Sequence, residues 1–199
     1  MAGASSDHSP VADPGPLGLG AFALTTFVLS ASNAKLLPAE AAPAFLGAAL
    51  FYGGVAQLLA GMWEFRKNNT FGATAFSSYG AFWLALASMV IMESMGIIKF
   101  GDARSAAVGT FLIGWTVFTF YMFIGSLRTN TAVMLVFLTL LITYLLLDLA
   151  EFGVLTSVPG GYTGLLCAFL AWYASAAGVI NSVAGREVLP IGNRAKTGR

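Results

Sequence analysis

Charged residues are scarce in this chain. Only 10% of its 199 residues are Asp, Glu, Lys or Arg, whereas soluble domains average about 25%. Hydrophobic residues make up 57% of the chain, which excludes an ordinary water-soluble domain. The net charge of +1 and the scattered basic residues provide no footprint for nucleic acid. We therefore expect membrane lipid as the solvent and no nucleic acid as a partner.

Cysteine and histidine are nearly absent as well. One cysteine, Cys167, and one histidine, His8, exclude an intrachain disulfide and a Cys/His metal site within the membrane. The same scarcity excludes a buried Ser-His pair for intramembrane proteolysis. No lysine lies within a charge-free stretch, and among the aspartates only Asp148 lies near a span. The sequence therefore predicts no enzyme, no metal site and no cofactor.

Long charge-free stretches occupy most of the chain. A helix that crosses a bilayer needs about 20 predominantly apolar residues, and six intervals have this character: 14–34, 41–63, 68–92, 105–127, 129–147 and 152–185. The sequence predicts an all-α integral membrane protein with six transmembrane helices per protomer. The expected helices begin at Leu17 and then cover Ala44–Trp63, Phe71–Ile98, Ser105–Leu127, Thr131–Leu149 and Tyr162–Ala184. The last begins at Tyr162 because the Pro-Gly-Gly segment at 159–161 is expected to break the interval.

The chain divides into three expected regions. Residues 1–16 are a mobile N-terminal tail with a proline-rich opening motif, 17–184 the six-helix domain, and 185–199 a basic cytoplasmic tail. Residues 1–13 contain no Lys or Arg, so we expect the first span to be retained rather than cleaved as a signal peptide. Six spans place both termini on one side, where the loops and tails hold seven Lys or Arg against three on the other side. The positive-inside rule then predicts cytoplasmic termini in the plasma membrane.

Small residues mark two helix faces. Gly47, Gly54 and Gly61 follow a heptad spacing, which predicts a seam for close helix packing. Gln57 lies on the same face, where an interhelical hydrogen bond and a pathway-lining role both remain open. A second stripe steps through the next span by four and three residues: Thr74, Ser78, Ala81, Ala85 and Ser88. Neighbouring hydroxyl and aromatic residues are Ser77, Tyr79, Phe82 and Trp83. Such hydroxyls either bond their own helix backbone or line a path.

Several motifs carry a family resemblance. Residues 13–19 read Asp-Pro-Gly-Pro-Leu-Gly-Leu, and further blocks lie at Phe51–Gln57, Gly61–Phe65, Asn69–Gly72, Ser77–Trp83, Phe169–Tyr173 and Val188–Gly192. These segments resemble the acetate uptake transporter family, which includes the succinate-acetate permeases. The family signature is Asn-Pro-Ala-Pro-Leu-Gly-Leu, and the positions that match it are Pro14, Pro16, Leu17, Gly18 and Leu19. Asp13 and Gly15 depart from it, and Asp13 places a carboxylate at the cytoplasmic mouth.

The resemblance implies a six-helix protomer that transports acetate, and often succinate, and assembles into a homo-oligomeric ring, a hexamer. It also implies a narrow apolar constriction at mid-membrane, formed by Phe22 and Tyr79, with Leu140 as the third residue by position. These three residues lie within two positions of the centres of their charge-free intervals. At ~1.5 Å per residue they share a level in the membrane to within a few Å.

Transport of a short carboxylic acid sets a physical requirement on the path. Such an acid is almost wholly anionic at pH 7, and moving the bare anion into hydrocarbon is costly. Uncharged donors can replace water around it and still release it. We expect these donors to include Thr74, Ser77, Ser78, Gln57 and Asn33.

Alternatives remain open at this stage. A channel for acetate and a proton-coupled symporter both fit, because the proton can travel on the acid itself. A channel for water or small neutral solutes, and a membrane scaffold or sensor that transports nothing, are the other two readings of six spans with small-residue stripes.

Overall fold

The six predicted spans are present in the structure. A computed structural model describes residues 11–193, so residues 1–10 and 194–199 of the two predicted tails lie outside the described residues. Six helical segments are long and apolar enough to cross a membrane: Gly15–Asn33, Ala39–Arg66, Thr70–Ser94, Gly101–Ser126, Thr131–Glu151 and Val158–Ala184. The described part of the chain is helical throughout its spans, as the sequence predicts.

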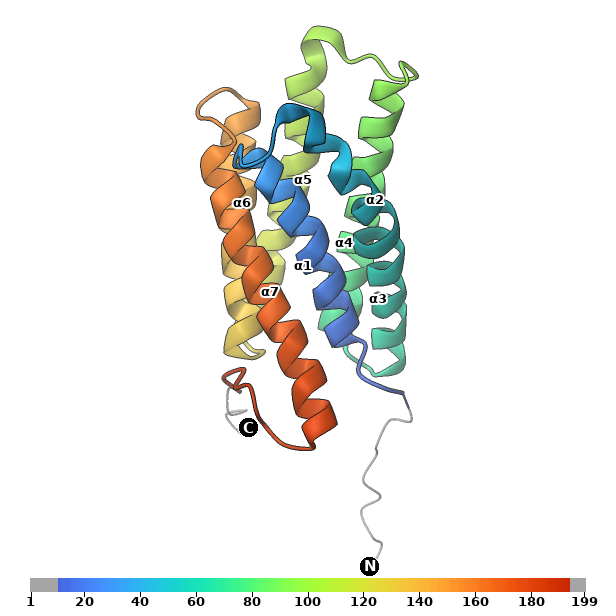
Figure 1. Cartoon of the computed structure of the whole chain (residues 1–199), viewed down its shortest axis with the longest axis vertical. Helices are drawn as coiled ribbons and strands as arrows, with labels where there is room; N and C mark the ends of the chain where they lie inside the picture. Colours follow the sequence, from blue (N-terminus) through green and yellow to red (C-terminus); the bar gives the residue numbers. More distant parts are fainter. Residues whose placement is uncertain (1–10, 194–199) are drawn as a thin grey trace, which may run out of the picture.

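The segments form one bundle (Figure 1). Its elements are α1 (Gly15–Asn33), η1 (Ala39–Ala44), α2 (Phe45–Leu50), η2 (Phe51–Ala56), α3 (Gln57–Arg66), α4 (Thr70–Ser94), η3 (Gly101–Ala103), α5 (Arg104–Ser126), α6 (Thr131–Glu151) and α7 (Val158–Ala184). Both ends of the described chain lie at the lower end of the bundle in Figure 1. The first, third and fifth spans, α1, α4 and α6, therefore start at the lower end and run upward in parallel. The α1 helix packs along α7 and against the second span.

The second span contains a π-helical segment that the sequence did not reveal. Residues 51–56 form η2, between two α-helical pieces. The wider turn shifts the helical phase, so the predicted heptad seam holds only in part. Gly54 and Gly61 are buried against α4, where Gly61 lies against Ser77. Gly47 faces open space within the protomer, so it does not contribute to the packing of α4 against the second span.

Two predicted helix boundaries are wrong by four residues each, for identifiable reasons. The α7 helix begins at Val158, not Tyr162, because Pro159 occupies the first turn, where its missing N–H is not needed. Gly161 is then inside the helix, where a Cβ would meet the Ala34 backbone. The α4 helix ends at Ser94, four residues before the predicted Ile98. Gly96 follows with φ +72°, a left-handed conformation that terminates the helix.

The proline-rich opening motif packs the start of α1 into the bundle. The helix begins at Gly15, two residues before the predicted Leu17. The Ser175 hydroxyl of α7 donates a hydrogen bond to the Pro16 carbonyl at 2.6 Å. A Cβ at Gly18 would lie 2.7 Å from the Phe76 ring of α4. The small residues of the motif therefore allow α1 to approach both α4 and α7 closely.

The small-residue stripe of α4 turns away from the bundle interior. Ala81, Ala85 and Ser88 are exposed in the protomer. The buried face of α4 instead includes Tyr79 and Trp83, each 3% exposed. Aromatic side chains rather than hydroxyls thus face the centre of the bundle from this helix.

Candidate functional site

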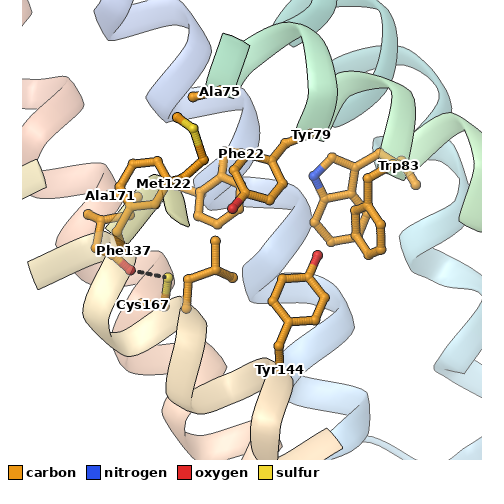
Figure 2. Close-up of a cluster of buried hydrophobic side chains, with 14 of the residues drawn as sticks. Phe22, Ala75, Tyr79, Trp83, Met122, Phe137, Tyr144, Cys167 and Ala171 are labelled. Carbon is orange, nitrogen blue, oxygen red and sulfur yellow. Dashed lines mark hydrogen bonds between the residues drawn. The ribbon is translucent and has the colours of Figure 1, made fainter. Parts of the chain in front are cut away.

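Three side chains predicted to form a constriction meet at the centre of the bundle. Phe22, Tyr79 and Leu140 are 5%, 3% and 6% exposed and belong to one cluster of buried hydrophobic residues. The Phe22 and Tyr79 ring centroids are 5.9 Å apart, and their side chains face each other in Figure 2. Because α1, α4 and α6 run in parallel, each helix contributes one side chain at the same level.

The Tyr79 ring is held by α5, a helix from which the sequence analysis selected no site residue. The hydroxyls of Tyr79 and Thr119 are 2.8 Å apart, and Thr119 is completely buried. The Phe118 ring packs edge-on against Tyr79 with a centroid distance of 5.2 Å. The hydrogen bond and the ring contact together restrict both the direction of the hydroxyl and the tilt of the ring.

A cavity lies above this cluster in the orientation of Figure 1. We call it the upper cavity; its volume is about 220 Å³ and its lining includes Phe22 and Leu140 at its base. One water needs only ~10–15 Å³ of such volume, so a short organic acid fits. Uncharged side chains with polar atoms in its lining are those of Thr26, Ser30, Asn33, Trp83, Thr143, Tyr144 and Ser157.

The charged residues that line the upper cavity are one arginine and two glutamates. The Nε atom of Arg104 lies 2.9 Å and 3.2 Å from the two carboxylate oxygens of Glu93. Glu151 also lines this cavity. An anion that enters therefore meets a guanidinium already engaged by a carboxylate, not a free cation that would hold it tightly.

A second cavity lies below the cluster. This lower cavity has a volume of about 300 Å³, and Phe137 and Ala75 belong both to its lining and to the central cluster. Phe137 precedes Leu140 by three residues and Ala75 precedes Tyr79 by four, about one helical turn in each case. The apolar cluster therefore separates two cavities that approach it from opposite ends.

The lining of the lower cavity includes two carboxylates, those of Glu64 and Asp13. Glu64 is 2% exposed, and its Oε2 accepts a hydrogen bond from Asn69 Nδ2 at 2.8 Å. Asp13, which replaces the signature asparagine, also lines the cavity. Lys67 Nζ lies 2.9 Å from Asp13 Oδ1. The charge that Asp13 adds at this mouth is thus compensated by a neighbouring lysine.

The segment after α7 folds back beneath the bundle. Asn181 accepts hydrogen bonds from the N–H groups of Val188 and Leu189 and donates one to the Leu189 carbonyl. Gly192 accepts from the Thr131 N–H at 3.0 Å. Ile191 lines the lower cavity. This C-terminal segment therefore forms part of the wall of the lower cavity.

The five predicted donors are not brought together. Asn33 lines the upper cavity, but Gln57, Thr74, Ser77 and Ser78 line neither cavity. Gln57 is 1% exposed, and within residues 11–193 its Oε1 has no hydrogen-bond partner. The Ser77 Oγ is likewise buried without a partner in that range, at the contact with α3.

The sequence analysis missed several residues that line the two cavities. Phe137, Thr26 and Tyr144 were not selected, and Trp83 was noted only for the aromatic density around it. A signal for three of the four was available: Thr26, Trp83 and Tyr144 each follow a predicted constriction residue by four positions, the spacing of one helix face. Thr119 could not be found in this way, because its role depends on how α5 packs against α4.

The six apolar helices define a multi-pass membrane protein in which two cavities approach one apolar cluster from opposite ends. The chain belongs to the GPR1/FUN34/yaaH family, whose model matches residues 2–190.

Individual relatives sharpen this comparison. The succinate-acetate/proton symporter SatP of Escherichia coli (strain K12) is 37% identical over 187 residues, which cover 93% of this chain and 97% of that protein. Accumulation of dyads protein 2 of Saccharomyces cerevisiae is 44% identical over 174 residues, and the chain spans 61% of its length. The solved structure of the bacterial acetate channel SatP has a TM-score of 0.85 and 38% identity, covering 92% of this chain and 99% of that one.

Proposed function

We propose that this protein transports acetate, related short monocarboxylates and succinate across the plasma membrane, with one pathway in each protomer. The observation that carries the proposal is the pair of cavities that end on opposite sides of one apolar cluster. In the proposal Phe22, Tyr79 and Leu140 form the constriction. The names of the SatP relatives, a succinate-acetate/proton symporter and an acetate channel, support this substrate class.

The chemistry of the constriction bears on the form in which the acid passes. A short acid is roughly 99.8% anion at pH 7 if its acidity resembles that of a glutamate side chain. The constriction gives this anion little stabilisation, because the Tyr79 hydroxyl is already hydrogen-bonded to Thr119. An apolar passage favours the neutral acid, which brings its own proton. We therefore propose electroneutral transfer of acid and proton, the mode that the word symporter in one relative's name describes.

Orientation and assembly complete the proposal. The lower end of the bundle, where the chain ends lie, is placed in the cytoplasm by the excess of Lys and Arg on that side. The protomers assemble as a homo-oligomeric ring, a hexamer. The exposed small residues Ala81, Ala85 and Ser88 support such contacts, since small residues permit close approach between helices in lipid.

Labelled acetate flux into proteoliposomes tests the function and the constriction together. Tyr79→Ala removes the ring between the cavities, so we expect faster entry of longer acids relative to acetate. Unchanged rates and an unchanged preference for acetate would show that Tyr79 is not part of the constriction. Swelling with neutral solutes but no acetate flux would favour the water or solute channel, and absence of any flux would favour a scaffold.

A further inference from the structure

We propose that Thr26, Trp83 and Tyr144 form a carboxylate-binding ring one helical turn above the constriction. This inference rests on the proposed function and deepens it, because it locates the step at which the acid leaves water. The ligand is the ionised carboxylate of a short monocarboxylic acid, which takes up a proton from water in the upper cavity before the neutral acid crosses the constriction. Its alkyl group lies below the ring, against the apolar side chains of the constriction.

Helix geometry places the three residues at one level. Each follows a constriction residue by four positions: Thr26 follows Phe22, Trp83 follows Tyr79, and Tyr144 follows Leu140. Because α1, α4 and α6 run in the same direction, four residues at ~1.5 Å per residue raise each side chain by ~6 Å above the constriction. Residues at this spacing also share a helix face. All three line the upper cavity.

Two of the three donors are buried without partners. Thr26 and Trp83 are 5% and 3% exposed, and within residues 11–193 neither the Thr26 Oγ1 nor the Trp83 Nε1 has a hydrogen-bond partner. A buried donor left unpaired is costly. The adjacent Thr25 shows the usual solution, because its hydroxyl donates to the Ala21 carbonyl at 2.9 Å. Both unpaired donors belong to residues that line the upper cavity, where a polar ligand can satisfy them.

Tyr144 supplies the third donor from α6. Its hydroxyl points toward Trp83 in Figure 2. The Phe82 ring packs edge-on against the Tyr144 ring, with the ring centroids 5.7 Å apart. A hydroxyl, an indole N–H and a phenol together match the acceptor-only oxygens of a carboxylate. None of them is charged, so the ring can replace water around the acid without holding it permanently.

The two neighbouring threonines of α1 provide a matched test. In proteoliposomes that transport labelled acetate, Thr26→Val removes the hydroxyl with little change in shape. We expect the half-saturation concentration for acetate to rise about tenfold, the loss typical of one hydrogen bond to a charged group. Thr26→Ser, which keeps the hydroxyl, is expected to restore the wild-type value. Thr25→Val removes a buried hydroxyl that lines neither cavity, so its half-saturation concentration should stay at the wild-type value.

Trp83→Phe provides an independent measurement from a different helix, with the same expected rise. A rise in both variants with rescue by Thr26→Ser supports the ring. An unchanged half-saturation concentration in either Thr26→Val or Trp83→Phe overturns it, because the donors then serve only packing or bound water. Absence of acetate flux in the wild-type protein is a separate outcome, which refutes the proposed function itself.

Discussion

From the hydrogen bond between Tyr79 and Thr119 we predict how far the rate of acetate flux changes when the bond is lost. Tyr79→Phe removes only the hydroxyl and keeps the ring in the proposed constriction. In the wild-type protein this hydroxyl lies 2.8 Å from the Thr119 hydroxyl, and both side chains are buried. A net contribution of about 1 kcal/mol is typical for such a bond. In the proposed constriction, passage of an acid requires the Tyr79 ring to swing aside and its hydrogen bond to Thr119 to break.

The size of the effect follows from this energy. A difference of 1 kcal/mol changes a two-state ratio by about fivefold. We therefore expect Tyr79→Phe to raise the population of the open constriction, and the initial rate of acetate flux, about fivefold. Thr119→Val removes the other partner and should raise the rate by the same factor.

The double variant separates this mechanism from others. If one shared bond accounts for the effect, Tyr79→Phe combined with Thr119→Val gives no further increase, since coupled residues are non-additive. Thr139→Val is the control, because the Thr139 hydroxyl donates to the Leu135 carbonyl of its own helix. Initial rates of labelled acetate uptake provide the measurement. Equal rates in wild type and Tyr79→Phe, at equal amounts of assembled protein, refute the reasoning.

Three further predictions concern packing, charge and the C-terminal segment. Gly61→Ala should lower the melting temperature of the purified protein, because the added Cβ would lie 2.5 Å from the α4 backbone. Gly47→Ala is the control: Gly47 faces open space, so this variant should leave the melting temperature unchanged or raise it. Lys67→Met leaves the Asp13 carboxylate uncompensated, so we expect acetate flux at low salt to fall, by less than about fivefold. The loss should disappear at high salt, or when Lys67→Met is combined with Asp13→Asn. Asn181→Leu should speed proteolysis of the C-terminal segment, and an unchanged digestion rate would show that other contacts hold it.

Parts of the site were predictable because they follow from local spacing. The positions of Phe22, Tyr79 and Leu140 near the centres of their spans place them at one level, whatever the helix packing. Their convergence on one axis additionally requires α1, α4 and α6 to turn the correct faces inward. The family resemblance supplied that information, and helical periodicity alone did not.

The predicted donors illustrate the opposite case. The hydroxyls of Thr74 and Ser78 form a clear stripe, yet α4 turns its aromatic side inward because Tyr79, Phe82 and Trp83 bury far more apolar area there. Similarly, the heptad spacing of the glycines did not predict one continuous face, because a π turn in the second span shifts the helical phase between Gly47 and Gly54.

The sequence by itself determined the solvent, the number of spans and the absence of a Cys/His site, because charge-free runs of sufficient length have no other stable setting than a bilayer. Only the tertiary structure decided which side chains face each other. The rotation of each helix about its axis is set by packing between helices, so the pairing of Tyr79 with Thr119 and the unpaired donors of Thr26 and Trp83 have no counterpart in the linear sequence.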